Sequence, residues 1–283
     1  MSTERISPTA YYTGHVWSRN GLSDPALDTR EGLAFFTALR PIMRIGRALT
    51  GGVALEEMLL QRHRIIDHLL TAAIEAGRVR QVLELAGGMS GRGVRFAGRY
   101  ARANLVYVEG DLPGMAARKR SGLASAGLTR PTHHVVALDI LADDGPLSLT
   151  EATRGLFDRS QGIAIITEGL LSYFDGATVA RLWRQLAEFA SPFAADVYLS
   201  DLHLSGRVDV AAIKVFRQML SVFARGRTHM HFARESEVAS ALARAGFART
   251  VVHHPRELAK TLPLPGVGGM EVVQVLEAST RAG

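Results

Sequence analysis

The stretch that decides the fold is LELAGGMSGRGVRF, residues 83–96, where a short apolar run passes into four glycines spread over seven positions and then into arginines. Glycines directly after an apolar strand are typical of the first turn of a nucleotide-binding α/β sheet, because they permit positive backbone angles and a close approach of ligand to main chain. The match to G-x-G-x-x-G is imperfect, since Ala86 stands at the first glycine position. No Gly-Lys-Ser/Thr follows, which excludes a phosphate loop of the Walker type.

Strand and helix patterns alternate on both sides of this stretch. Short runs rich in Val, Ile, Leu and Tyr predict strands at 81–86, 104–110, 133–140, 162–170, 196–204, 248–254 and 270–278. Helical periodicity occurs at 55–76, 94–102, 114–126, 177–190 and 235–245. The alternation predicts an α/β fold with a Rossmann-like, seven-stranded, mostly parallel sheet and helices on both faces. The last two strands are separated only by a Pro/Gly-rich loop, which favours an antiparallel C-terminal hairpin.

Two segments fall outside the alternation. Residues 1–54 contain helical spacing interrupted at Pro41, and we expect them to form an N-terminal helical cap. Residues 205–234 are again amphipathic and form a predicted insertion after the fifth strand. The domain prediction is therefore a cap at 1–54 and a cofactor-binding core at 55–283, with both extra segments covering the carboxyl ends of the strands, where ligands bind in such sheets.

Composition narrows the classes of protein. The 283 residues are 47% hydrophobic, which is enough for a large core, and the net charge of +6 comes from scattered basic residues that do not indicate nucleic-acid binding. The absence of cysteine excludes disulfides, thiolate nucleophiles and cysteine-based zinc sites. The N-terminus lacks the apolar segment of a signal peptide, and no stretch of about 20 uncharged apolar residues predicts a membrane span. We therefore expect a cytoplasmic protein with a small-molecule substrate, no metal and no membrane partner; the oligomeric state is left open.

Acidic residues follow the next three predicted strands. Asp111 ends the second strand, about twenty residues after the glycines, where a carboxylate can accept hydrogen bonds from the hydroxyl groups of a ribose. Asp139 ends the third strand and Glu168 ends the fourth. The carboxyl ends of parallel strands meet at one edge of a sheet, so we expect these acids to face one cofactor. A dehydrogenase needs the glycines and the first acid, but not the whole series.

Four motifs in this order together resemble a known family. The first loop is LAGGMSGRGVR at 85–95, for a family pattern of roughly L-G-A-G-L-D-T-R-x-x-R. The pattern E-V-D-L-P appears as EGDLP at 109–113, R-x-x-x-I-D as RHRIID at 62–67, and E-G-x-x-x-Y as EGLLSY at 168–173. The chain resembles class I S-adenosylmethionine-dependent methyltransferases, specifically the leucine carboxyl methyltransferase family with its bacterial polyketide O-methyltransferase branch. It departs from the family at Ala86 and at Ser90-Gly91, which replaces Asp-Thr.

The resemblance implies S-adenosyl-L-methionine as the cofactor and a role for each motif. The glycines would lie against the methionine part, Arg92 or Arg95 would hold its carboxylate, and Glu168 would lie near its ammonium group. Asp111 would bind the ribose, in competition with Glu109, which lies on the same face of the strand. The predicted cofactor contacts are Gly87, Gly88, Gly91, Arg92, Glu109, Asp111, Asp139, Ile140 and Glu168, with Asp139 and Ile140 meeting the adenine.

The acceptor is expected to be a carboxylate or a hydroxyl of a secondary metabolite, of a polyketide-like kind. A hydroxyl requires a base and a carboxylate requires an orienting group. The candidates are His203 and Tyr173 first, then Tyr11, Tyr12, His15, Arg225, Arg227, His229 and His231. Two alternatives stay open: a Rossmann-type NAD(P)-dependent oxidoreductase, and a non-catalytic binding protein that keeps the cofactor fold.

Overall fold

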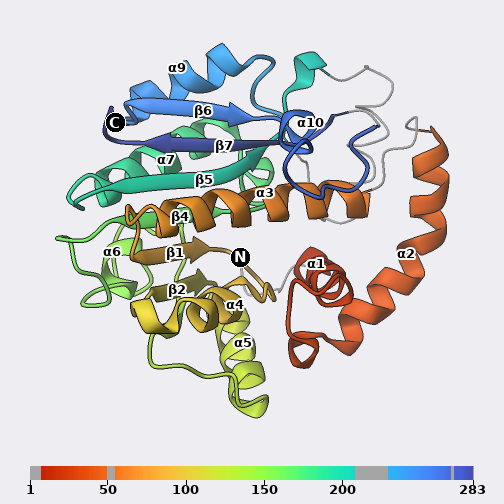
Figure 1. The fold of residues 1–283 in the computed structure, drawn as a ribbon, viewed down its shortest axis with the longest axis horizontal. Helices are drawn as coiled ribbons and strands as arrows, with labels where there is room; N and C mark the ends of the chain where they lie inside the picture. Colours follow the sequence, from red (N-terminus) through yellow and green to blue (C-terminus); the bar gives the residue numbers. More distant parts are fainter. Residues whose placement is uncertain (1–7, 50–54, 208–228, 269–270, 283) are drawn as a thin grey trace. The chain divides into compact units, whose positions relative to one another are not determined.

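The computed structural model describes residues 8–49, 55–207, 229–268 and 271–282. Within them the strands form one seven-stranded sheet in the order β3-β2-β1-β4-β5-β7-β6 (Figure 1). The strands are β1 (Gln81–Leu85), β2 (Val106–Asp111), β3 (His133–Ala137), β4 (Ile163–Thr167), β5 (Asp196–Leu202), β6 (Arg249–His253) and β7 (Gln274–Ser279). The predicted fold class, a mostly parallel α/β sheet with antiparallel C-terminal strands, is confirmed.

Helices and turns of 3-10 helix connect these strands. The helices are α1 (Pro8–Arg19), α2 (Arg30–Leu49), α3 (Leu55–Glu75), α4 (Arg92–Arg99), α5 (Pro113–Ser125), α6 (Leu149–Ala152), α7 (Gly176–Ala190), α9 (Glu235–Ala245) and α10 (Pro255–Leu258). The 3-10 turns are η1 (Pro25–Leu27), η2 (Ala101–Ala103), η3 (Leu171–Tyr173) and η4 (Ser205–Arg207). The interruption expected at Pro41 is wrong, because α2 continues through it; a proline removes one backbone hydrogen bond, and bonds on either side can carry the helix on.

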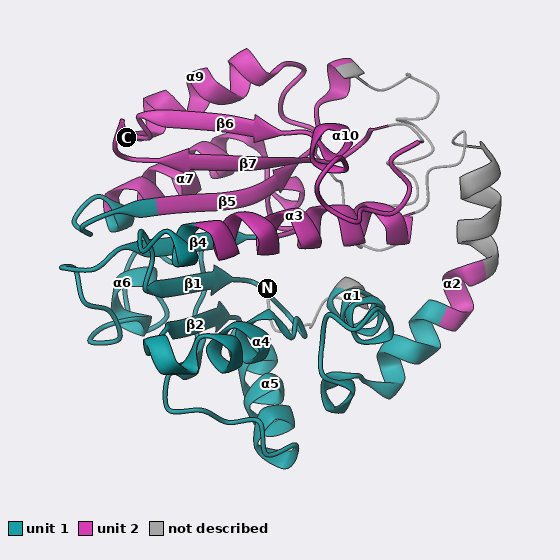
Figure 2. Ribbon diagram, viewed as in Figure 1, with its two compact units in different colours: residues 1–36, 73–167, 189–196 teal, residues 37–72, 168–188, 197–283 magenta. Residues whose placement is uncertain are grey.

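The chain divides into two compact units (Figure 2). Unit 1 consists of residues 1–36, 73–167 and 189–196, and unit 2 of residues 37–72, 168–188 and 197–283. The predicted cap boundary falls at residues 50–54, outside the described residues, and the domain division stays a prediction. Most of the predicted insertion, with Arg225 and Arg227, also lies outside them.

Unit 1 contains the parallel part of the sheet. β1 pairs in parallel with both β2 and β4, and β2 pairs in parallel with β3. All five residues of β1 and of β4 are buried, as expected for central parallel strands covered on both faces. The carboxyl ends of β1 and β2 are therefore neighbours, and the glycine loop follows the first of them.

Unit 2 contains the antiparallel part. β7 pairs antiparallel with β6 and with the β5 residues from Tyr198 to Leu202, so that β6 forms the edge of the sheet. The arrows of β6 and β7 run in opposite directions in Figure 1. The segment between them contains one helical turn, α10, which confirms the predicted hairpin of two strands joined by a Pro/Gly-rich loop.

Candidate functional site

The loop after β1 turns sharply at two left-handed residues. Ala86 and Gly88 both have φ of 55°, a conformation that suits glycine and strains a residue with a Cβ atom. The Ala86 N–H donates to the Gly110 carbonyl at 2.8 Å, which ties the turn to the neighbouring strand. The departure from the family pattern at Ala86 therefore occupies a position whose backbone favours glycine.

Asp111 lies at the end of β2 and faces this loop. Its Oδ2 accepts the Gly88 N–H at 2.9 Å, and its Oδ1 accepts the Leu112 N–H at 2.8 Å. Burial raises the pKa of Asp111, and the two backbone N–H groups only partly oppose this shift. A carboxylate oxygen has more than one lone pair, so a half-buried Asp111 can accept further hydrogen bonds from hydroxyl groups. This carboxylate acceptor fits the hydroxyl groups of a ribose at the glycine turn.

Glu109, the predicted competitor of Asp111, is buried in a different environment. Its carboxylate contacts Lys119 Nζ, and its Oε1 lies 2.7 Å from His133 Nε2. Burial raises the pKa of Glu109, but Lys119 and His133 outweigh burial and hold that pKa below its ordinary value. Glu109 is 2% exposed, whereas Asp111 is only half-buried, which favours Asp111 over Glu109 as the ribose partner.

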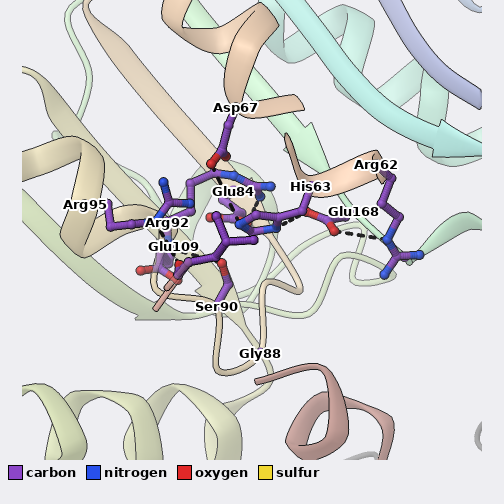
Figure 3. Close-up of polar contacts among 12 residues, drawn as sticks. Arg62, His63, Asp67, Glu84, Gly88, Ser90, Arg92, Arg95, Glu109 and Glu168 are labelled. Carbon is purple, nitrogen blue, oxygen red and sulfur yellow. Dashed lines mark hydrogen bonds and ion pairs between the residues drawn. The ribbon is translucent and has the colours of Figure 1, made fainter. Parts of the chain in front are cut away.

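Arg92 begins α4 and is fully buried. Its Nη1 lies 2.5 Å from Glu84 Oε1, and the other oxygen of Glu84 accepts the Tyr107 hydroxyl at 2.6 Å (Figure 3). Arg95, the other predicted carboxylate partner, donates from Nε to the Leu22 carbonyl at 2.8 Å. Glu84 was not among the predicted site residues. A single acid within a buried apolar strand requires a partner, and this pattern was the available signal.

Gly87 and Gly91 approach other parts of unit 1 closely. A Cβ atom on Gly87 would lie 3.2 Å from Glu84 Cδ, and one on Gly91 would lie 2.5 Å from Ser23 Oγ. Asp139 lies two residues after β3 and accepts the Leu141 N–H at 3.0 Å; Ile140 beside it is buried. The predicted contacts of unit 1 thus lie after β1, in the last residues of β2 and after β3.

Glu168 follows β4 and belongs to a polar network within unit 2. Its Oε1 accepts from Arg62 Nε at 3.0 Å and its Oε2 lies 2.9 Å from His63 Nδ1 (Figure 3). Arg62 Nη1 also donates to Asp201 Oδ2 at 2.9 Å, and Asp201 Oδ1 accepts the Gly169 N–H at 2.6 Å. His63 and Asp201 were not among the predicted site residues. Asp201 is an acid in a strand that is otherwise largely apolar, the same pattern as Glu84.

The two leading catalytic candidates differ in exposure. His203 is half-buried, and its Nδ1 lies 2.9 Å from the Val272 carbonyl, which requires the proton on Nδ1. Burial lowers the pKa of His203, so the ring is neutral at pH 7. Tyr173, in η3, is 36% exposed.

The remaining candidates fall in both units. His229 donates its N–H to the Ser172 carbonyl, and His231 Nε2 lies 3.1 Å from the Leu171 carbonyl. Burial lowers the pKa of His231. In unit 1, Tyr11 and Tyr12 are buried. His15, also in unit 1, pairs with Asp28 at 2.8 Å.

The described ranges offer neither a metal site nor a membrane-spanning helix. No group of three or more His, Asp or Glu side chains there could hold a metal ion. No helix in the same ranges is long and apolar enough to cross a membrane.

Comparisons with known proteins match this chain to one family model and to methyltransferase relatives. A family model described as leucine carboxyl methyltransferase matches residues 40–187. A Mycobacterium marinum protein, provisionally named an S-adenosyl-L-methionine-dependent methyltransferase, is 34% identical over 182 residues, which are 60% of this chain and 57% of that protein. A similarly named protein of Mycobacterium tuberculosis H37Ra is 37% identical over 133 residues, covering 46% of this chain and 40% of the relative. The chain thus matches about half the length of these curated relatives.

Solved structures share the fold at low sequence identity. A Thermobifida fusca protein, provisionally named a methyltransferase, has a TM-score of 0.66 at 13% identity, covering 98% of this chain and 96% of its own. A duf574 family protein of Streptomyces avermitilis has a TM-score of 0.67 at 12% identity, covering 96% and 97%. At such identities the likeness concerns the fold alone.

Proposed function

The chain belongs to the leucine carboxyl methyltransferase family, and from this premise we propose that it transfers a methyl group from S-adenosyl-L-methionine to an oxygen atom of a small acceptor. The observation that carries the proposal is the hydrogen bond from the Gly88 N–H to the Asp111 carboxylate at 2.9 Å. It joins the glycine turn that follows β1 to the acid that ends β2, and these two strands are adjacent and parallel. This is the place at which an open α/β sheet binds the ribose of a nucleoside.

In this proposal unit 1 holds the adenosine part of the cofactor. Asp111 accepts hydrogen bonds from the ribose hydroxyls, and Gly87, Gly88 and Gly91 provide a turn without side chains. Gly88 and Gly91 are buried, and a Cβ atom there would meet Ala10 and Ser23. Asp139 and Ile140 meet the adenine. Glu168 keeps its predicted role near the methionine ammonium, supported only by the sequence motif, because Arg62 and His63 already engage both of its oxygens.

The cofactor supplies an electrophilic methyl group on a sulfonium. The C–S bond breaks as the new C–O bond forms in line with it, so the protein contributes alignment and a dry environment. For a hydroxyl acceptor, His203 would take the proton on Nε2, since Nδ1 donates to Val272. For a carboxylate acceptor no base is needed, and Tyr173 would orient the acid. A polyketide-like secondary metabolite is the acceptor class that the sequence resemblance suggests.

Calorimetry tests the cofactor assignment. We expect S-adenosylhomocysteine to bind and NAD not to bind; the reverse would establish the oxidoreductase, and binding of neither would refute the methyltransferase. Asp111→Asn should weaken S-adenosylhomocysteine about ten-fold or more, on the order of a lost hydrogen bond to a charged group. Asp144→Asn is the matched control, because Asp144 is an exposed acid of the same unit. An equal effect of both changes would remove the ribose assignment.

Methyl transfer itself separates the proposal from a non-catalytic binding protein. Radiolabelled S-adenosylmethionine would be incubated with panels of phenols, alcohols and carboxylic acids. A hydroxyl acceptor predicts that His203→Gln lowers kcat while S-adenosylhomocysteine affinity stays constant, whereas a carboxylate acceptor predicts this for Tyr173→Phe. Tight cofactor binding without transfer to any panel member favours the binding protein.

A further inference from the structure

Glu84 and Arg92 form a buried ion pair directly beneath the glycine loop. We propose that they are positioning residues: the pair, which we term the clamp, fixes residues 87–92 so that the Gly88 N–H points at Asp111, and thereby sets cofactor affinity without touching the cofactor. The effect on affinity rests on the proposed function, whereas the effect on the loop does not. The proposal gives Arg92 a role different from the carboxylate contact that the sequence predicts.

The clamp has no access to solvent. The side chains of Arg92 and Glu84 are 0% and 1% exposed, and Arg92 Nη1 lies 2.5 Å from Glu84 Oε1. The Tyr107 hydroxyl donates to the second oxygen of Glu84 at 2.6 Å, so both oxygens of the carboxylate have a hydrogen-bond partner. Two charges removed from water remain stable only if each satisfies the other, so loss of either one leaves an uncompensated charge.

Both ends of the loop, at Gly87 and at Ser90, contact the residues of the clamp. At the first end, the missing Cβ of Gly87 leaves room for the Glu84 side chain, since a Cβ there would lie 3.4 Å from the same Oε1 that binds Arg92. At the other end, the Arg92 N–H donates to Ser90 Oγ at 3.2 Å, and the Ser90 N–H donates back to the Gly87 carbonyl at 3.0 Å. Gly88 lies between these points and makes its bond to Asp111. Figure 3 shows Glu84 and Arg92 beside each other, with Ser90 and Gly88 in the same region.

The experiment compares a buried and an exposed ion pair on the same helix. Arg92→Met removes the buried guanidinium; Arg99→Met is the matched control, because Arg99 of α4 pairs with Glu75 at 3.0 Å with both side chains more than half exposed. The double variant Glu84→Gln/Arg92→Met removes both charges and keeps the test valid if the single variant fails to fold. Hydrogen exchange is followed at the amides of Gly88 and of Leu83, a buried residue of β1.

In the double variant, which leaves neither partner of the pair unpaired, we expect exchange at Gly88 to become about ten-fold faster, as for a lost hydrogen bond, while Leu83 keeps its protection. S-adenosylhomocysteine affinity should fall by a similar factor, and Arg99→Met should change neither quantity. Unchanged exchange at Gly88 in a folded double variant would overturn the proposal. Equal acceleration at Gly88 and Leu83 would also overturn it, since that indicates general destabilisation. If the wild-type protein fails to bind S-adenosylhomocysteine, the proposed function is refuted and the exchange data still decide on the clamp.

Discussion

Ala86→Gly should stabilise the protein, against the usual effect of placing glycine in a folded chain. Ala86 has φ of 55°, and a left-handed backbone costs a residue with a Cβ atom about 1–2 kcal/mol. Glycine avoids this cost but adds about 0.4–1 kcal/mol of conformational entropy to the unfolded chain. The midpoints of these two ranges differ by a net gain of about 0.8 kcal/mol in the free energy of unfolding.

Thermal unfolding can measure this gain. For a protein of this size it corresponds to an increase in Tm of about 1–4 °C. Ala97→Gly is the matched control: Ala97 is buried in α4, where glycine costs about 1 kcal/mol relative to alanine. Ala86→Val should have the opposite effect and lower Tm, because a β-branched side chain tolerates a positive φ less than alanine does.

The affinity of Ala86→Gly for S-adenosylhomocysteine completes the test. The wild-type backbone already has the glycine-like angle, so the dissociation constant should stay within about two-fold, a difference below 0.5 kcal/mol. A lower Tm in Ala86→Gly, together with an unchanged Tm in Ala86→Val, would refute the reasoning. That pair of results would mean that residue 86 does not adopt the left-handed conformation in solution.

Further predictions concern two other positions. Gly91→Ala should lower the free energy of unfolding by about 1–3 kcal/mol, since its Cβ would lie 2.6 Å from Ser23 Cα; urea denaturation measures this, and a loss below about 0.5 kcal/mol would contradict it. The lowered pKa of His203 means that the unfolded chain binds its proton more readily, so the stability of wild type relative to His203→Gln should fall as pH drops below about 6.5. A difference that stays constant from pH 7.5 to 5 would contradict the second prediction.

The sheet could be predicted because each strand carries its own pattern. Residues 162–170 contain an uninterrupted apolar run at 163–166, and the apolar run at 82–86 is broken only by Glu84. The structure places β1 and β4 side by side in the interior of the seven-stranded sheet. The C-terminal hairpin could be predicted because only a Pro/Gly-rich loop separates its strands. Pro41 shows the limit of such local rules, since whether a proline ends or merely interrupts the bonding of a helix depends on what the helix packs against.

The choice between Asp111 and Glu109 could not be made from the sequence. Strand alternation puts both side chains on one face, and both are carboxylates. They differ in their partners: Lys119 and His133 come from α5 and β3, and no spacing rule connects them with Glu109. Backbone N–H groups surround Asp111 instead. The distinction therefore arises from tertiary contacts.

The pKa of Asp111 gives a physical reason to assign it a function. A carboxyl group whose pKa is raised on folding contributes stability below its ordinary value of 3.8, and this contribution is lost as pH rises through the folded-state pKa. At neutral pH the ionised Asp111 therefore costs the fold free energy. Glu109, whose pKa is lowered, makes the opposite contribution through its ion pairs. Groups whose perturbed pKa lowers the stability of the fold are concentrated at functional sites. A bound ligand can offset the free energy that such a group costs in the empty site. Hydroxyl groups of a ribose, donating to Asp111, would supply that recovery, so cofactor binding should lower the pKa of Asp111 and leave that of Glu109 unchanged.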